Sequence, residues 1–499
     1  MCFKFFKEIE SMPNKKISVV HVSAEVAPFS KTGGLGDVVK SLPKALFKAG
    51  HDIKIITPLY GRIIDIEKYN LKLIFKDVKV IVDSENSVKV NFWQGELIEG
   101  LPVYFIENKK YFSKHKRVYG SGQENVRFLI FNVAVLKLLN ILDLSPDIIH
   151  CHDWHAGLIP YYLKSKSRYT KNLSKTRTIF TIHNLAFQMG KNWFNIPLEK
   201  KDYGRKKLPL INNSDIENIN FAKRAILSAD IVNTVSEKYR EEIMTKKFGQ
   251  DLNRILKNRS RRLFGIVNGI DYNSYNPRND YGLFKNFDEK SHYLKLENKK
   301  YLQKKLGLAI NANAPMFCST SRITHQKGFD LILKLLPYLL RMDVQIVFMG
   351  DGRNEYIKEI RGFCKKFPKK IAWLAMDQKR ETLLYAASDF FILPSYYEPC
   401  GINQMIAMRY GSVPIVRETG GLHDTVKNFN PNSDTGLGFT FKYEDEFSFF
   451  WAIVRALENY KYKNVWNELI KRIMLQSSNW EIPAQKYVEL YKKAMRIKD

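Results

Sequence analysis

The stretch Lys31-Thr32-Gly33-Gly34-Leu35-Gly36-Asp37 decides how this chain is interpreted. It lies between an apolar, strand-like run at 17–22 and a helix-like run at 38–46. Glycines at a strand-to-helix turn let the backbone approach a ligand, and the helix that follows offers unpaired N–H groups and the positive end of its dipole. The lysine suits an anionic group and the aspartate suits sugar hydroxyls. We interpret the loop as a phosphate-and-sugar cradle, with an ordinary glycine turn as the alternative.

Short apolar runs alternate with helix-like stretches along the whole chain. Strands are expected at 17–22, 52–57, 101–106, 147–151, 178–183 and 231–235, and then at 316–320, 345–349, 371–374, 390–393 and 413–416. Apolar strands separated by helices predict parallel sheets with helices on both faces. Because one sheet cannot hold so many repeats, we predict an α/β protein with two Rossmann-like, doubly wound domains. The seam is expected near residues 264–271, which gives domains at 1–263 and 264–476.

The length and composition fit this two-domain prediction. The 499 residues are too many for one ordinary core, and the hydrophobic fraction of 45% is normal for a globular protein. The strongest apolar stretch, 128–142, contains three polar residues and is too short to span a membrane. The N-terminus has no signal-peptide pattern, and five cysteines without a paired spacing indicate a reducing compartment. We therefore expect a cytoplasmic protein with no membrane partner.

The formal net charge of +29 has two interpretations. It could serve a polyanionic partner such as nucleic acid, or it could reflect a generally basic surface. The cations are scattered, with short patches at 109–117 and 200–207, and the chain has no zinc-ligand spacing, aromatic–basic RNA motif or basic leucine zipper. We favour the general surface composition and expect no nucleic-acid partner. A basic surface would still attract an anionic sugar nucleotide.

Polar motifs follow several of the expected strands at the point where each strand ends. They are His152-Asp153-Trp154-His155, His183-Asn184, the stretch 321–328, the stretch 394–401 and the stretch 417–422. Ligands of open α/β sheets bind beyond the carboxyl ends of the strands. In a protein with two facing domains, this rule predicts a site in the cleft between them.

The second half of the chain carries the charges that suit a sugar nucleotide. Arg322 and Lys327 lie five residues apart across an expected strand-to-helix turn. An arginine fork and a lysine point charge can neutralise a leaving diphosphate, which would make a metal unnecessary; solvated surface cations are the alternative. Glu398 precedes a helix expected to start near Gly401. It either holds sugar hydroxyls and offsets charge on a reacting sugar, or serves as a carboxylate at the helix start.

Two other groups of residues have a less specific pattern. The spacing of His152, Asp153 and His155 suits metal ligands, but no second Cys or His motif accompanies it, so we favour histidine hydrogen bonding beside a sugar and expect no metal. His183 taken alone fits a core position as well as a site position. Cys400 has no adjacent base to activate it, so we interpret it as packing rather than as a nucleophile.

Six motifs, in order along the chain, resemble those of bacterial glycogen synthases and plant starch synthases. They are the Lys31–Asp37 loop, the His152–His155 block, Thr181-Ile182-His183-Asn184-Leu185-Ala186, Ser321-Arg322 with Gln326-Lys327-Gly328, Glu398-Pro399-Cys400-Gly401, and Thr419-Gly420-Gly421-Leu422. The resemblance covers about residues 17–491. It implies a GT-B fold, with the two domains facing across a cleft. It also implies a retaining transferase that adds glucose from a sugar nucleotide, ADP-glucose in bacterial and plant relatives, to the non-reducing end of an α-1,4-glucan.

The resemblance also implies roles for the residues that match its motifs. Asp37 and His155 would hold the transferred glucose, Arg322 and Lys327 would take the diphosphate, and Glu398 would lie by the glucose ring; these five are the expected catalytic residues. The expected substrate-binding residues are Lys31, Gly33, Gly34, Tyr111, His183, Asn184, Tyr385, Cys400, Gly401, Thr419, Gly420 and Gly421. Tyr385 would pack against the nucleotide base, Tyr111 would be a cleft tyrosine, and residues 477–499 would form a helix that crosses back to the first domain. No cofactor is expected beyond the donor.

The sequence departs from the family motifs at a few positions, and other functions are possible alternatives. Tyr111-Phe112-Ser113-Lys114-His115 lacks the acidic residue and arginine usual there, which concerns acceptor or loop contacts and not the phosphate or glucose motifs. Ile406 stands where the sucrose-synthase-like group often has a second glutamate, and this favours the glycogen-synthase interpretation. The alternatives are another GT-B transferase, with a UDP-glucose donor or a non-glucan acceptor, and a non-catalytic glucan- or nucleic-acid-binding protein. The intact site motifs argue against lost catalysis.

Overall fold

The computed structural model describes residues 16–165 and 171–497. Cys2 and the N-terminal stretch for which no signal peptide is expected lie outside the described residues. Within the described part, no helix is long and apolar enough to cross a membrane. The chain divides into two compact units, of which the first extends to Thr234, continues over Ile243–Phe264 and includes the chain from Glu481 onward. The second comprises Val235–Glu242 and Gly265–Trp480.

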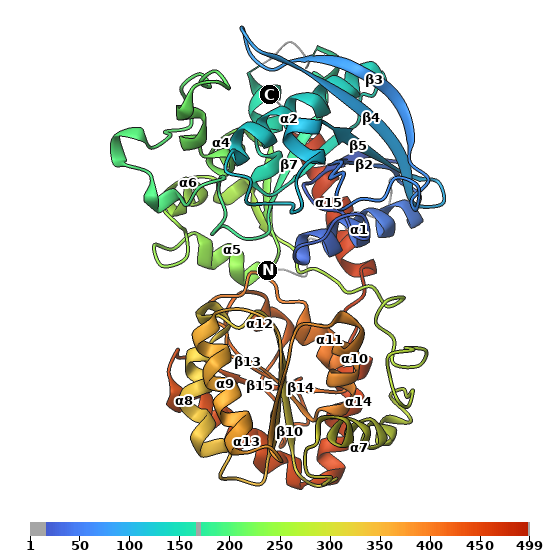
Figure 1. The fold of residues 1–499 in the computed structure, drawn as a ribbon, viewed down its shortest axis with the longest axis vertical. Helices are drawn as coiled ribbons and strands as arrows, with labels where there is room; N and C mark the ends of the chain where they lie inside the picture. The colour runs from blue at the N-terminus through green and yellow to red at the C-terminus, as the bar shows by residue number, and fades with distance from the viewer. Residues whose placement is uncertain (1–15, 166–170, 498–499) are drawn as a thin grey trace. The chain divides into compact units, whose positions relative to one another are not determined.

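The first unit is built on a nine-stranded sheet with the strand order β3-β4-β5-β2-β1-β6-β7-β8-β9 (Figure 1). Pairing is parallel from β5 through β8, as the apolar strand runs predict. The strands are β1 (Ser18–Val22), β2 (Asp52–Pro58), β3 (Lys72–Ile81), β4 (Ser87–Ile98), β5 (Leu101–Glu107), β6 (Ile148–His152), β7 (Arg177–Ile182), β8 (Ile231–Thr234) and β9 (Leu263–Gly265).

The hairpin of β3 and β4 is antiparallel and was not expected from the sequence. Its outer strand, β3, has three lysines and one aspartate among its ten residues. Most of its side chains are exposed or half-buried. Because such a strand lacks the apolar run of a buried parallel strand, its sequence does not stand out from a polar loop. The strand that joins the two units, β9, and β15 of the second unit are only three residues long, and they were also missed.

The helices of the first unit pack around this sheet. They are α1 (Gly34–Lys48), α2 (Glu124–Ile141), α3 (Leu158–Lys164), α4 (Phe221–Ser228), α6 (Asn253–Asn258) and α15 (Glu481–Met495), while α5 (Glu237–Ile243) lies at the change between units. Helix α2 contains most of the strongest apolar stretch, and almost all of its residues are buried. A helix that is apolar on all sides is a core helix when it is surrounded by protein, which accounts for this stretch.

The last helix, α15, belongs to the first unit although the second unit precedes it in the sequence. It packs against α1 and β7 (Figure 1). The Tyr491 hydroxyl lies 2.9 Å from Nδ1 of His150, and Asn233 donates to the Tyr487 hydroxyl at 3.0 Å. Both tyrosines are buried, so this end of the chain is part of the core of the first unit.

The second unit contains a six-stranded sheet, parallel throughout, with the order β12-β11-β10-β13-β14-β15. Its strands are β10 (Met316–Thr320), β11 (Gln345–Met349), β12 (Ile371–Leu374), β13 (Phe390–Leu393), β14 (Val413–Arg417) and β15 (Phe439–Phe441). Its helices are α7 (Lys295–Leu306), α8 (Phe329–Leu339), α9 (Asn354–Lys366), α10 (Gln378–Ala387), α11 (Asn403–Arg409), α12 (Gly420–Thr425), α13 (Glu446–Lys461) and α14 (Lys463–Leu475).

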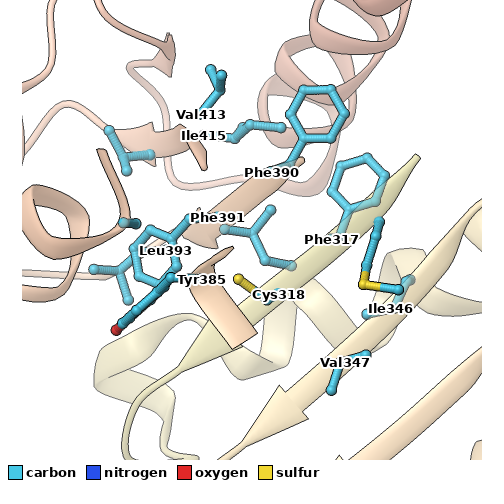
Figure 2. Packing of buried hydrophobic residues seen from close by; sticks show 14 of the residues in the cluster. Phe317, Cys318, Ile346, Val347, Tyr385, Phe390, Phe391, Leu393, Val413 and Ile415 are labelled. Carbon is cyan, nitrogen blue, oxygen red and sulfur yellow. The ribbon is translucent and has the colours of Figure 1, made fainter. Parts of the chain in front are cut away.

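The core of the second unit explains why its strands were predictable. The bounds of β10, β11, β12 and β13 are those expected from the sequence, because each strand is a short apolar run. Figure 2 shows these strands presenting Phe317, Ile346 and Phe390 to a common apolar interior. The rings of Phe317 and Phe390 stack with centroids 4.7 Å apart. The prediction of parallel α/β units with helices around each sheet is therefore confirmed.

Candidate functional site

The glycine-rich loop of the first unit joins β1 to α1, as the sequence predicts. Helix α1 begins at Gly34, with Gly33 at its N-cap, and Asp37 lies in its first turn. The Lys31 ammonium lies 2.8 Å from the Asp37 carboxylate, and each side chain is about one-third exposed. The two charged residues expected to meet phosphate and sugar are therefore paired with each other in the absence of substrate.

A carboxylate that the sequence analysis did not single out, Glu25, occupies part of this loop. Its Oε2 accepts hydrogen bonds from the backbone N–H groups of Thr32 and Gly33, and its Oε1 accepts one from the Tyr119 hydroxyl at 2.5 Å. Burial raises the pKa of Glu25, and these hydrogen bonds oppose the shift. Two backbone N–H groups of the loop expected to bind phosphate therefore already donate to a carboxylate of the protein itself. The available signal was a lone acidic residue inside an apolar stretch, because a buried carboxylate needs partners.

His155 lies beside this network. Its ring stacks on that of Tyr119 with centroids 4.8 Å apart, and the side chain is buried. Its backbone carbonyl accepts a hydrogen bond from Asn132 of α2, which also accepts from the N–H groups at the start of α3. Burial lowers the pKa of His155 far below its usual value, so the ring is neutral. Its Nδ1 is buried and has no hydrogen-bond partner among the described residues.

Asp153 and His183 meet at the carboxyl ends of β6 and β7. The His183 backbone N–H donates to Asp153 Oδ1 at 2.7 Å, while Nε2 of the His183 ring lies 3.0 Å from Nδ1 of His152. Burial raises the pKa of Asp153 to about 7. Asp153 also has a positive φ of 55°, a strained conformation for a residue other than glycine. A strained, buried carboxylate at a strand end is typical of a functional site, so Asp153, which the sequence analysis weighed only as a metal ligand, joins the candidates.

The two remaining candidates of the first unit, Asn184 and Tyr111, make mainly local contacts. The Asn184 side chain closes a local turn by accepting from the Ala186 N–H. Tyr111 lies in a short helical turn, Lys109–Ser113, with its ring largely buried and its carbonyl held by Arg127 at 2.6 Å. Within the described residues, Tyr111 has no hydrogen bond to the other candidates, so its expected role as a cleft tyrosine stays a prediction.

The charged residues of the second unit do come together. Lys327, in a short 3₁₀ turn over His325–Lys327 after β10, contacts the carboxylate of Glu398, which follows β13. The Ser395 hydroxyl donates to the same carboxylate at 3.2 Å. Glu398 is buried and Lys327 is mostly buried, whereas Arg322 is exposed. The sequence spacing did not predict that Lys327 pairs with the glutamate, and the expected role of Arg322 and Lys327 toward a diphosphate stays a prediction.

Backbone packing fixes the loop that contains Glu398. The Gly421 N–H donates to the Glu398 carbonyl at 3.0 Å. A Cβ at Gly420 would lie 1.9 Å from that carbonyl oxygen, and Gly420 has a φ of 44°. Only glycine permits this approach, so the expected pair Gly420-Gly421 serves at least to set the Glu398–Gly401 loop in place.

The Thr419–Gly421 turn is also bound by a carboxylate from elsewhere in the second unit. Glu242 Oε1 accepts from the Thr419 hydroxyl and from the Gly420 N–H, both at 3.0 Å. Burial raises the pKa of Glu242, and these two hydrogen bonds oppose the rise. Glu242 accepts a hydrogen bond from a glycine N–H at this turn, as Glu25 does at the first-unit loop. No spacing in the sequence links Glu242 to Thr419.

Cys400 is buried next to Asn268. Burial raises the pKa of its thiol to about 12, while a hydrogen bond from the Asn268 backbone opposes the rise. A thiol with this pKa stays protonated at neutral pH and is a poor nucleophile, which agrees with its interpretation as packing. Asn268 is itself buried, and its side-chain oxygen has no partner among the described residues. It is a further polar group that the sequence analysis missed.

The expectation for Tyr385 is wrong in this structure. Its ring is fully buried in the core of the second unit, near Phe391 (Figure 2). Its hydroxyl contacts Thr320 and donates to Glu381 at 2.8 Å. A ring with no exposed surface cannot stack on a nucleotide base. The short motif around Tyr385 matched, but helix α10 turns this residue toward β10 and β13 rather than outward.

Comparisons with known proteins place the two halves of the chain consistently. Residues 18–258 match the family described as the starch synthase catalytic domain, and residues 303–472 match glycosyl transferases group 1. A glycogen synthase of Geotalea daltonii is 40% identical over 494 residues, covering 95% of this chain and 98% of its own. A glycogen synthase of Clostridioides difficile is 39% identical over 490 residues, covering 95% and 99%.

Two solved structures extend these comparisons. The catalytic domain of starch synthase IV from Arabidopsis thaliana, bound to ADP and acarbose, is 34% identical and covers 97% of this chain and 100% of its own, with a TM-score of 0.84. A sucrose-phosphate synthase from Thermosynechococcus elongatus has a TM-score of 0.60 at 16% identity, covering 96% and 99%, and this likeness concerns the fold alone.

Proposed function

The chain belongs to the glycogen and starch synthase family of GT-B glycosyltransferases, and on this basis we propose that it transfers glucose from ADP-glucose to the non-reducing end of an α-1,4-glucan. The family and the GT-B fold expected from the six motifs are both confirmed. The proposal concerns the donor, the stereochemistry and the roles of individual residues. For the donor, the supporting observation is that the similar starch synthase IV was solved with ADP and acarbose.

The contact between Lys327 and Glu398 is the structural observation that carries the proposed mechanism. The buried pair of Lys327 and Glu398, with the exposed Arg322 in the same β10–α8 connection as Lys327, would provide cations for an anionic leaving group and a carboxylate for a sugar. When the donor diphosphate binds, Lys327 exchanges its contact with Glu398 for the phosphate oxygens, together with Arg322. Glu398 is then free to accept hydrogen bonds from sugar hydroxyls and to offset positive charge on the ring.

The reaction that follows breaks two bonds and forms two, counting the transfer of one proton. The bond from the anomeric carbon to the diphosphate oxygen breaks, and its electron pair leaves with ADP, stabilised by Arg322 and Lys327. A hydroxyl of the acceptor glucan bonds to the same face of the anomeric carbon, so the configuration is retained. The acceptor's proton passes to the departing diphosphate oxygen. Cys400 takes no part because its thiol is protonated and buried. We propose that no metal is needed, since the two cations stabilise the leaving group.

The first unit supplies the groups that suit a sugar. Asp37 is released from Lys31 when that ammonium turns to phosphate, and it then binds glucose hydroxyls. The unpartnered Nδ1 of the neutral His155 ring offers one further hydrogen bond to the sugar. His183 and Asn184, at the end of β7, complete this set. A cytoplasmic location forms part of the proposal, supported by the four described cysteines, which are all free thiols.

A transfer assay tests the proposal. Glucose transfer onto glycogen is measured from ADP-glucose and from UDP-glucose, with EDTA present, for the wild type and for Glu398→Ala and Lys327→Ala. We expect ADP-glucose transfer that survives EDTA and falls by at least about 100-fold in both variants. A preference for UDP-glucose would overturn the donor and leave the mechanism. Loss of activity in EDTA that a divalent ion restores would overturn metal independence.

A further inference from the structure

Three histidine side chains of the first unit form a continuous hydrogen-bonded row that ends at the candidate site. Nδ1 of His21, from β1, lies 3.0 Å from Nε2 of His152, from β6. Nδ1 of His152 lies 3.0 Å from Nε2 of His183, which follows β7. We call His21, His152 and His183 the histidine row. His21 and His152 have no exposed surface, while His183 is half-buried.

The rings of the row are neutral. Burial lowers the pKa of His21 and of His183 to about 3, and it lowers the pKa of His152 well below the usual value, with nearby histidines adding to the effect. A neutral imidazole has one N–H and one bare nitrogen. Each bond of the row therefore needs one ring to donate and the next to accept.

The atoms that face each other restrict the row to two arrangements. If His21 donates from Nδ1, then Nε2 of His152 is bare, its proton lies on Nδ1, and His183 in turn carries its proton on Nδ1. If the sense is reversed, all three protons lie on Nε2. The three rings must therefore share one tautomer, and the nitrogen that His183 leaves for a ligand is either always a donor or always an acceptor.

The row does not lead to solvent at its inner end. Nε2 of His21 is buried and has no hydrogen-bond partner within the described residues. A proton entering at His183 would have no acceptor beyond His21. This excludes a proton path along the row and leaves a positioning role.

A metal site is a poorer interpretation of the same cluster. Nitrogen atoms of His21, His150 and His152 lie within 4.8 Å of one another. However, the His150 and His152 rings stack with centroids 4.1 Å apart at 27°, and those of His21 and His152 lie at 19° to each other. Lone pairs in nearly parallel ring planes do not converge on one ion. Both nitrogens of His150 are also occupied, by the Tyr491 hydroxyl at 2.9 Å and the Thr181 hydroxyl at 2.7 Å.

We propose that His21 and His152 are positioning residues, which fix the tautomer and the ring orientation of His183 so that its free Nδ1 meets the sugar substrate in one hydrogen-bonding state. This rests on the proposed role of His183 in binding the sugar. A group held in one tautomer by its far-side partner needs no rearrangement when the substrate arrives, and such pre-organisation lowers the barrier to reaction. The three strands β1, β6 and β7 are neighbours in the sheet, so they hold the three rings in register.

The tautomers can be read directly by nitrogen-15 NMR of the full chain labelled at histidine, with single variants used for assignment. We expect His21, His152 and His183 to share one tautomer in the substrate-free protein. We expect His21→Phe, which removes the inner bond, to give His183 mixed tautomers. Different tautomers within the row, or a His183 signal that is unchanged in His21→Phe, would overturn the proposal.

Kinetics distinguish positioning from packing. We expect His21→Phe to lower kcat for glucose transfer by about 10-fold or more, and His21→Asn, whose amide can reach the position of Nδ1, to recover most of that loss. His150→Phe is the matched control, because His150 stacks on the row without bonding to it. Equal losses in His21→Phe and His150→Phe would mean packing alone. If His183→Ala keeps full activity, the proposed role of His183 fails, whereas the NMR result still decides whether the row is coupled.

Discussion

The Lys327 ammonium contacts the Glu398 carboxylate although 71 positions separate the two residues in the sequence. The contact connects the loop after β10 to the loop after β13, and these two strands are neighbours in the second sheet. It pairs a buried carboxylate with a mostly buried cation. The pair therefore contributes to the stability of the second unit, and the proposed mechanism gives it a second role in catalysis once the donor binds.

Removing the lysine tests the first of these roles. Lys327→Ala leaves the Glu398 carboxylate buried with only the Ser395 hydroxyl, and we expect a loss of about 3 kcal/mol in the free energy of unfolding, measured with urea. Lys327→Ala combined with Glu398→Gln is expected to recover most of that stability but no activity. The control is Lys334→Ala, because Lys334 is exposed and lies 3.5 Å from Glu446; it should change stability by less than about 1 kcal/mol. Equal losses in the two lysine variants would contradict the prediction.

Asp153 gives stability a pH dependence of known sign. Its pKa is raised from 3.8 in the unfolded chain to about 7 in the folded protein, so its contribution is fully present below pH 3.8 and is lost as the pH rises toward 7. Relative to the wild type, Asp153→Asn should therefore gain stability between pH 5 and pH 8, by an amount on the order of 3 kcal/mol. Urea unfolding of both proteins across this range checks it, and a difference that does not vary with pH would refute it.

Tyr385 should behave as a core residue. Tyr385→Phe removes the hydroxyl that donates to Glu381 and contacts Thr320, and we expect a loss of about 1–2 kcal/mol in the free energy of unfolding. The KM for the nucleotide donor should stay within about twofold of the wild type. A rise in KM without a loss of stability would restore the base-stacking role that burial argues against.

The glycine at position 420 should resist substitution. Gly420→Ala places a methyl group 1.9 Å from the Glu398 carbonyl oxygen, so we expect displacement of the Glu398 loop, a loss of about 1–3 kcal/mol and a large fall in kcat. Gly362→Ala is the control, because Gly362 lies inside α9 with nothing within 4 Å of an added Cβ. It should raise stability by about 0.5–1 kcal/mol and leave activity unchanged. Matching effects at the two positions would contradict the packing argument.

The positive charge of the chain should not confer specific nucleic-acid binding. In filter-binding assays with RNA and DNA, we expect weak retention at low salt that disappears at moderate salt, as for contacts with phosphates alone. Binding that is tight and resists salt would revive a nucleic-acid partner.

The parts of this molecule that were predictable from sequence are those that short-range patterns determine. Strands such as β10 and β13 are buried along their whole length, so β13 is entirely apolar and β10 begins with three apolar residues. Strand β3 has mostly exposed or half-buried side chains and therefore carries no such pattern. The Lys31–Asp37 loop and the Arg322–Lys327 turn were found because each is a local motif.

The missed residues make contacts that no spacing in the sequence indicates. Glu242 reaches the Gly420 turn across 178 positions of the sequence. Glu25 lies only 8 positions from Gly33, but the N–H groups that its carboxylate meets depend on how the loop folds. Tyr385 shows the converse failure, since a matching motif cannot say which side of its helix faces the core. Asp153 was visible as a residue, but its strain and its raised pKa arise only from the folded surroundings.

The position of α15 has a consequence for how the protein is made. The core of the first unit needs Tyr487 and Tyr491, which leave the ribosome only after the whole second unit has been synthesised. At about 5–20 residues per second, this delay is roughly 10 to 40 seconds. During that time both segments of the second unit are already made, while the core of the first unit still lacks α15. A chain that ends at Trp480 and is released from the ribosome should therefore hold its second unit folded and its first unit sensitive to protease.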